Sequence, residues 1–314
     1  MNISLPINIF DKRTLLELWI GQNGYASVLL ESGGIINNPI EQLKYTACFA
    51  LTKFYLSGAQ LKPFNPIIGE TFQANIGNSH FYLEQTSHHP PISNFYGFGR
   101  NYKIYGWNES SAETGPNSVE ILYKGNMIVE YQNGTKNTVI YPSMKLGGTM
   151  IGQRILKFKG KVVIIDKEND LICIAKIDPD ERKGIEKISK KKLSFPDYVK
   201  GVITSLSKNI TVRRKQYHVI NKQKFIFSIL EGEFTNKISF DGNTYWEKRD
   251  NTFFKTIFRQ NFTLPSDSYF REDLFFFRQN DLDLAQKYKM KLEEDQRKDE
   301  KLRELFRKNK KIKK

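Results

Sequence analysis

Between about residues 70 and 260 the chain consists of short runs rich in β-branched and aromatic residues, separated by turn signals. Asn133-Gly134 and Asp241-Gly242 stand between alternating segments and predict β-hairpins with tight turns. An open sheet of so many antiparallel strands tends to curl, and closure removes its exposed edges. We therefore predict an α+β fold, mainly β, built on a large near-closed antiparallel β-barrel that is wide enough to hold a ligand.

Helical patterns flank this region on both sides. Residues 11–18 predict a short helix capped by Asp11 or Thr14, and residues 39–57 predict an amphipathic helix with Pro39 in its first turn. From Leu282 onward, apolar positions between charges predict a long helix. The lysine-rich stretch 179–223 is expected to be a solvated loop.

On length alone, the chain of 314 residues could form one domain or two. Its expected parts are an N-terminal segment with helices (1–60), the barrel (61–262), a C-terminal helical region (263–307) and a mobile basic tail (308–314).

The net charge of the chain limits the classes of partner that it is expected to bind. Lys and Arg number 49 against 34 acidic residues, a net charge of +15, which predicts attraction to nucleic acid, an anionic membrane leaflet or a phosphorylated ligand. Cys48 and Cys173 lie in apolar runs and are expected to be reduced core residues, which favours a cytoplasmic location. Because we find neither a secretory signal nor an apolar run of roughly 20 residues, we expect only transient, peripheral membrane contact.

The segment Glu84-Gln85-Thr86-Ser87-His88-His89-Pro90-Pro91 is the strongest candidate for a site. Two consecutive prolines remove backbone donors and stiffen the chain, and adjacent imidazoles converge on one ligand only if the backbone bends. A metal site is the weaker interpretation, since His80 and His218 are the only other histidines and adjacent histidines have poor ligand spacing.

Two further segments complete a recognisable set. Lys62-Pro63-Phe64-Asn65-Pro66-Ile67-Ile68-Gly69-Glu70 precedes the histidine segment, and Leu264-Pro265-Ser266-Asp267-Ser268 is followed by Ala285, Lys289, Glu293 and Arg297 at intervals of four. Together with the histidine segment, these residues resemble the fingerprints of the oxysterol-binding protein family's ligand-binding domain. The resemblance extends from Leu5-Pro6 to about Arg297.

The resemblance implies a single domain over residues 1–314, with a near-complete barrel around an apolar tunnel, N-terminal helices and a C-terminal helical region. Family members carry one lipid at a time, commonly a sterol or phosphatidylserine, and many exchange it for phosphatidylinositol 4-phosphate. The resemblance thus implies a lipid-transfer protein that binds anionic membranes, transforms nothing chemically and needs no cofactor. We expect a monomer.

The same resemblance assigns the head-group site. It implies that His88 and His89 contact the phosphate, that Lys62 and the region of Asn65 close the other side, and that Lys289, Glu293 and Arg297 complete the set. Residues four apart share one side of a helix, so the last three alone would be interpreted as an ordinary exposed ion-pair ladder. Leu15, Trp19 and Phe49 are candidate tunnel residues.

The chain also departs from the family pattern. Leu5-Pro6 stands almost at the start, so we expect no lid helix ahead of it and faster release of an apolar lipid. Thr86 replaces a usual valine, and Tyr269 replaces a usual arginine, which removes a cation from that region.

Two other classes of function compete with lipid transfer. The basic charge and the interleaved Tyr and Phe also suit nucleic-acid binding, but no zinc finger, helix-turn-helix or RNP-like segment accompanies them. A lipid hydrolase would need a nucleophile elbow of the type G-x-S-x-G, which we do not find. The sequence decides neither between transfer and sensing nor between sterol and diacyl cargo.

Overall fold

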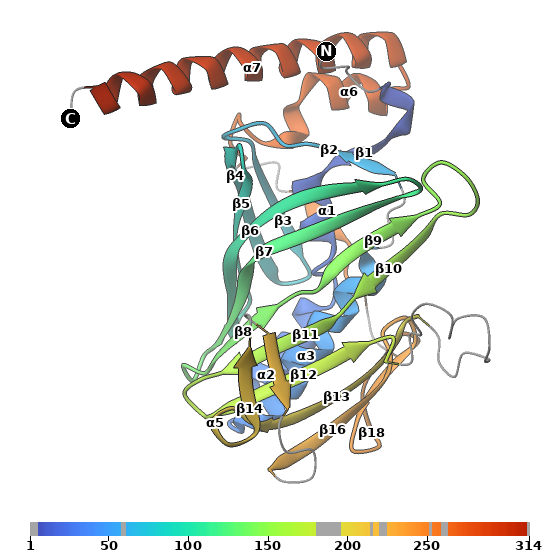
Figure 1. Cartoon of the computed structure of the whole chain (residues 1–314), viewed down its shortest axis with the longest axis vertical. Coiled ribbons are helices and arrows are strands. Elements are labelled where there is room, and N and C mark those ends of the chain that lie inside the picture. Colours follow the sequence, from blue (N-terminus) through green and yellow to red (C-terminus); the bar gives the residue numbers. More distant parts are fainter. Residues whose placement is uncertain are drawn as a thin grey trace.

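The computed structural model describes residues 6–57, 61–179, 196–213, 216–219, 225–250, 253–258 and 263–312. Its centre is one 15-stranded sheet in the order β18-β17-β16-β13-β12-β11-β8-β7-β6-β5-β4-β3-β19, with β9 paired to both β7 and β10. The sheet curls strongly (Figure 1) but its end strands, β18 and β19, do not pair with each other. The prediction of a mainly β fold with a near-closed antiparallel sheet is confirmed.

The strands follow one another mostly as antiparallel neighbours. Their bounds are β3 Thr71–Ile76, β4 Ser79–His88, β5 Pro91–Phe98, β6 Tyr102–Gly115, β7 Ser118–Tyr131, β8 Lys136–Ile140, β9 Ser143–Gly147, β10 Ile155–Lys159, β11 Lys161–Asp166, β12 Leu171–Ile177, β13 Tyr198–Ser205, β16 Ile226–Glu233, β17 Lys237–Phe240, β18 Asn243–Glu247 and β19 Thr256–Phe258. Outside this sheet, β1 Phe10–Thr14 pairs in parallel with β2 Lys62–Phe64, and β14 Ile210–Arg213 pairs with β15 Gln216–Val219.

Three N-terminal helices pack against the sheet and share its main core. They are α1 Leu15–Gly21, α2 Ala26–Ile35 and α3 Pro39–Leu56, preceded by the 3-10 turn η1 Ile7–Ile9. Leu16, Leu29 and Phe49 of these helices are buried with Val129, Cys173 and Phe240 of the sheet. The sheet therefore wraps around the helices; in Figure 1, α2 and α3 lie behind β11 and β12, and α1 lies higher, near β3.

The C-terminal region forms a second, smaller core with the start of the chain. It contains η3 Ser268–Phe270, α6 Glu272–Arg278 and α7 Leu282–Ile312. Phe10 and Phe64 from β1 and β2 are buried here against Leu274, Phe277 and Ala285. This core holds α7 across the end of the sheet at which β4 finishes (Figure 1).

Several predicted boundaries need correction. The first helix begins at Leu15, because Thr14 is its N-cap and accepts a bond from the Glu17 amide, whereas Asp11 lies in β1. Within the stretch predicted as a lysine-rich loop, the structure contains β13, the short helix α5 Leu206–Asn209, β14 and β15, while residues 180–195, with the lysines 190–192, lie outside the described residues. Residues 308–312, predicted as part of a mobile tail, are helical in α7.

Candidate functional site

The loop from Lys62 to Glu70 is fixed by a buried arginine from the C-terminal region. The Arg271 guanidinium lies 2.8 Å from Glu70 and 2.7 Å from Asp273, and the three side chains are almost fully buried. Arg271 also donates to the carbonyl of Asn65 at 2.9 Å, and Glu70 accepts the Ile67 amide at 3.0 Å. Burial raises the pKa of Glu70 to about 7, although the Arg271 charge acts in the opposite direction. This network ties the loop to the start of α6.

Four of the predicted head-group residues meet above β1 and β2. Lys62 donates to the Asn65 side chain at 3.1 Å, and Lys289 donates to Glu293 at 2.6 Å. Both ammonium groups lie over the ring of Phe10, at 4.6 Å for Lys62 and 5.1 Å for Lys289. Burial, together with the nearby positive charge of Lys289, lowers the pKa of Lys62 to about 8.

The burial of Lys289 decides between two interpretations of the α7 residues. Its side chain is only 4% exposed, whereas an ordinary surface ion-pair ladder is open to water on both partners. Lys289 and Glu293 are thus turned toward the body of the protein. Buried Lys289 and half-buried Lys62 lie over the same ring and form a concentrated positive charge, which suits an anionic ligand.

The histidine pair comes from the end of β4 and lies against α7, further along that helix. His88 ends β4 and His89 follows it in the turn to β5, with ring centroids 4.7 Å apart. His89 Nε2 lies 3.3 Å from Glu300 of α7. His88 Nδ1 is buried and has no hydrogen-bond partner among the described residues. Burial, and secondarily the neighbouring His89, lowers the pKa of His88, which favours its neutral form.

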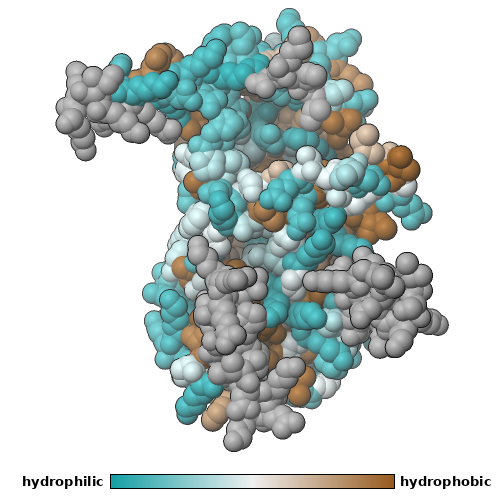
Figure 2. All heavy atoms as spheres, in the orientation of Figure 1, coloured by the Kyte–Doolittle hydropathy of each residue, from teal (hydrophilic) through white to brown (hydrophobic). Residues whose placement is uncertain are grey.

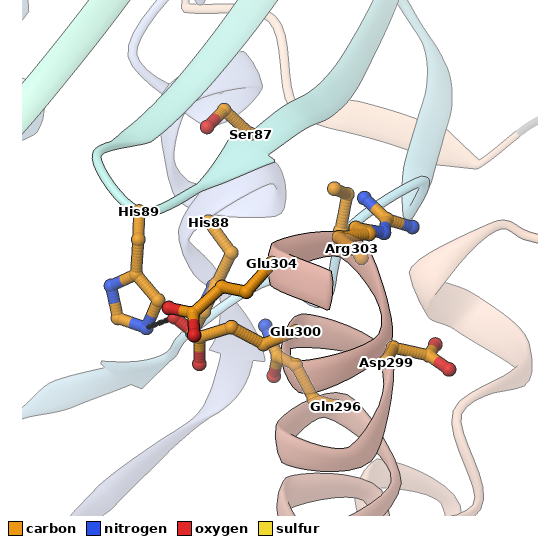
Figure 3. A pocket seen from close by; sticks show the side chains of 9 residues that line it. Ser87, His88, His89, Gln296, Asp299, Glu300, Arg303 and Glu304 are labelled. Atoms are coloured by element: carbon orange, nitrogen blue, oxygen red, sulfur yellow. Dashed lines mark ion pairs between the residues drawn. The ribbon is translucent and has the colours of Figure 1, made fainter. Parts of the chain in front are cut away.

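A pocket of about 160 Å³ opens between the histidine turn and α7. In Figure 3, His88 and His89 point toward Glu300 and Glu304, with the ion pair of His89 and Glu300 drawn as a dashed line. The pocket is lined by Ile68, Ser87, His88, His89, Gln296, Asp299, Glu300, Arg303 and Glu304.

The predicted site residues are thus arranged along one helix. Lys62, Asn65, Lys289 and Glu293 form the first group, and His88 and His89 lie at the pocket about two turns further along α7. Arg297 lies on α7 between the two groups. Its side chain is exposed and is not among those that line the pocket. The role of each residue in binding stays a prediction.

Sequence reasoning missed several members of this region. Arg271 and Glu300 carry no signal of their own, because their partners come from segments far apart in the chain. Although Tyr269 replaces the arginine that is usual in the family, a cation lies next to it. Arg278 lies over the Tyr269 ring at 5.7 Å and pairs with Glu17 at 2.9 Å. Thr86 is exposed, and its hydroxyl accepts a bond from Asn94 at 2.7 Å.

The three candidate tunnel residues have different surroundings. Phe49 is fully buried in the main core, Trp19 is half-buried against it, and Leu15 is half-buried at the start of α1. Their contact with a lipid stays a prediction. Residues 1–5, which include Leu5, lie outside the described residues.

The described residues contain neither an apolar helix of membrane-spanning length nor a metal-binding cluster. None of their helices is long and apolar enough to cross a membrane. In the same part of the chain, no group of three or more His, Cys, Asp and Glu side chains is placed to hold a metal ion.

Sequence comparison supports the motif assignment. The family model described as "Oxysterol-binding protein" matches residues 1–313. "Oxysterol-binding protein 9" of Dictyostelium discoideum is 31% identical over 301 residues, covering 95% of this chain and 70% of that protein. "Oxysterol-binding protein-related protein 3C" of Arabidopsis thaliana is 28% identical over 52% of this chain and only 36% of its own length.

Comparison with solved structures shows the same fold. The ORD of Osh3 from Saccharomyces cerevisiae, solved in complex with PI(4)P, matches with a TM-score of 0.75 at 18% identity, over 97% of this chain and 81% of that one. The ORD of Osh1, solved in complex with ergosterol, matches with a TM-score of 0.73 at 20% identity, over 98% and 77%. With three motifs in place, a curled sheet around N-terminal helices and a family model that matches nearly every residue, the chain belongs to the oxysterol-binding protein family.

Proposed function

We propose that this protein transfers lipids between membranes. In this proposal the barrel binds one lipid at a time, a sterol or phosphatidylserine, and exchanges it for phosphatidylinositol 4-phosphate. The observation that carries the proposal is that the group of Lys62, Asn65, Lys289 and Glu293 and the histidine pair both lie against one helix, α7. Complexes of similar domains with PI(4)P and ergosterol support it.

The site has the chemistry that a phosphoinositide head group requires. Lys62 and Lys289 supply positive charge, and Glu293 and Asn65 supply acceptors for inositol hydroxyls. An adjacent phosphate raises the pKa of His88 and favours the imidazolium, which donates from both ring nitrogens. Binding of the phosphate therefore favours uptake of a proton from solvent by this histidine.

Two exposed apolar features suit contact with a membrane. Met150 and Ile151, both 80% exposed, lie at the tip of the β9–β10 hairpin, where brown atoms reach the right edge of the face in Figure 2. On α7, Leu302, Leu305 and Phe306 are exposed between basic residues. Apolar side chains flanked by lysine and arginine bind anionic leaflets peripherally, each basic residue contributing about 1 kcal/mol.

A liposome extraction assay tests the site. The double variant His88→Ala, His89→Ala should lose phosphatidylinositol 4-phosphate extraction by at least tenfold. His80→Ala is the matched control, since His80 lies on the same strand and bonds to Asn75 at 2.8 Å, away from α7. Extraction that is unchanged in the double variant would exclude the head-group assignment.

A protein that exchanges two lipids should show a property that a protein that only binds them lacks. If both lipids occupy the same protein in turn, phosphatidylinositol 4-phosphate must displace bound sterol or phosphatidylserine, and transport of one must accelerate transport of the other between two liposome populations. A lipid sensor would bind without this coupling.

A further inference from the structure

Lys53, near the end of α3, carries an ammonium group inside the main core region. Its Nζ donates to Asn23 Oδ1 at 3.0 Å and lies 3.9 Å from the sulfur of Met127 on β7. The rings of Phe49 and Tyr141 lie beneath it, at 5.3 and 5.9 Å. The neighbours of the amine therefore come from α3, the turn between α1 and α2, β7 and the connection after β8.

No carboxylate among the described residues pairs with Lys53. Burial alone lowers its pKa to about 7. Among the described residues, the one titratable group in contact with it is Tyr141, whose pKa burial raises, so this phenol stays neutral. Asn23 and Met127 are uncharged, and a lone cation in such surroundings costs several kcal/mol unless an anion accompanies it.

Lys53 as a residue nevertheless retains some accessible surface. Lys53 and Tyr141 are half-buried, although burial strongly shifts the pKa of both. Tyr123 of β7 behaves in the same way: it is half-buried and burial raises its pKa to about 12. Lys53, Tyr141 and Tyr123 therefore keep part of their surface accessible although protein surrounds them.

We propose that Lys53 and Asn23 form the polar end of an interior site for a lipid that carries a carboxylate, such as a long-chain fatty acid, whose acyl chain lies in the barrel. The inference rests on the proposed lipid-binding function and names a further class of cargo for it. The carboxylate pairs with the ammonium group, and the acyl chain replaces water against the surrounding aromatic side chains.

A carboxylate fits this amine better than a sterol hydroxyl does. Asn23 and Met127 accept at most two of the three ammonium hydrogens, which leaves one for a ligand. A hydroxyl can use that hydrogen but leaves the charge uncompensated, whereas a carboxylate supplies the missing countercharge. Binding of the anion raises the pKa of Lys53, so the complex takes up protons from solution near pH 7.

The test measures binding of monomeric oleate to the full chain by calorimetry at pH 7. In wild type, comparison of buffers with different ionisation enthalpies should show uptake of about half a proton per oleate, because Lys53 is then half-protonated. The oleate Kd should rise about fifty-fold between pH 7 and pH 9 as the free amine loses its charge.

Variants assign the effect to this side chain. Lys53→Met, of similar length and uncharged, should weaken oleate binding by at least tenfold and abolish the proton uptake. Lys44→Met is the matched control, because Lys44 is a buried lysine of the same helix that is paired with Glu41 at 2.9 Å. Unchanged oleate affinity in Lys53→Met would overturn the proposal, even if the same substitution abolished sterol binding.

The wild-type measurement keeps the proposal testable if a variant fails to fold. Wild-type protein that binds no oleate, or binds it without proton uptake, overturns the inference. Phosphatidylinositol 4-phosphate extraction is measured on the same samples. Protein that extracts the phosphoinositide but ignores oleate refutes the Lys53 site alone, whereas protein that extracts no lipid refutes the proposed function.

Discussion

The guanidinium of Arg271 lies 2.8 Å from the carboxylate of Glu70, a residue 201 positions earlier in the chain. This buried pair joins the loop that carries Lys62 and Asn65 to the C-terminal region that carries α7. This interaction therefore helps to position both groups of residues that are predicted to bind the head group.

Arg271→Met should destabilise the protein by roughly 3–5 kcal/mol, because it leaves Glu70 and Asp273 buried without their cation. Urea unfolding measures the change. The control is Arg249→Met, whose ion pair with Glu247 lies at the surface with the arginine 79% exposed; it should change the free energy of unfolding by less than 1 kcal/mol. Equal effects of the two substitutions would refute the structural role of Arg271.

Glu300→Gln should strengthen phosphoinositide binding about two- to five-fold. Glu300 lies 3.3 Å from His89, and its negative charge opposes a phosphate at the same imidazole. Binding to liposomes that contain phosphatidylinositol 4-phosphate measures the change. Glu294→Gln removes an equal charge from α7 that pairs with the exposed Lys298 instead, so it should have no comparable effect.

Head-group affinity should fall as pH rises through about 8. The free Lys62 loses its proton in this range, since burial and Lys289 lower its pKa to about 8, and an anionic ligand binds the protonated form. Between pH 7.5 and 9 the loss should be up to about eightfold in wild type. Lys62→Met should bind more weakly at pH 7.5 and show a flatter profile. An equally steep profile in this variant would assign the pH dependence to another group.

Lys53 should make the stability of the protein depend on pH. The pKa of this amine is lowered from 10.5 to about 7 on folding, so between these values the unfolded chain binds more protons than the folded one. Stability therefore rises with pH across this window, by at most about 1.4 kcal/mol per unit. The difference in unfolding free energy between Lys53→Met and wild type should favour the variant at pH 7 and shrink toward pH 10.5. A difference that stays constant would contradict the lone buried cation.

Local features were the ones that the sequence predicted well. The turn Asp241-Gly242 joins β17 and β18 with φ angles of 51° and 80°, because these residue types tolerate the left-handed conformation that a tight hairpin needs. Asn38 accepts bonds from the amides of Ile40 and Glu41, with Pro39 at the first turn, so α3 begins where its local signals place it.

Features that depend on distant contacts were missed. The helix α2 contains Gly33-Gly34, a pair more typical of a turn, yet a Cβ at Gly33 would lie 2.6 Å from the hydroxyl of Tyr131 on β7. Glycine is needed there for close packing on the sheet, which no local pattern reveals. The interior position of Lys53 is hidden for the same reason, because a lysine between apolar residues is usually predicted to reach solvent.

The central claim is that the side chains gathered along α7 recognise a phosphorylated lipid head. Its most direct test is extraction of phosphatidylinositol 4-phosphate from liposomes by wild type, by the His88→Ala, His89→Ala variant and by His80→Ala. The account predicts extraction by wild type and His80→Ala and a loss of at least tenfold in the double variant. Equal extraction by all three proteins, or none by wild type, would contradict it.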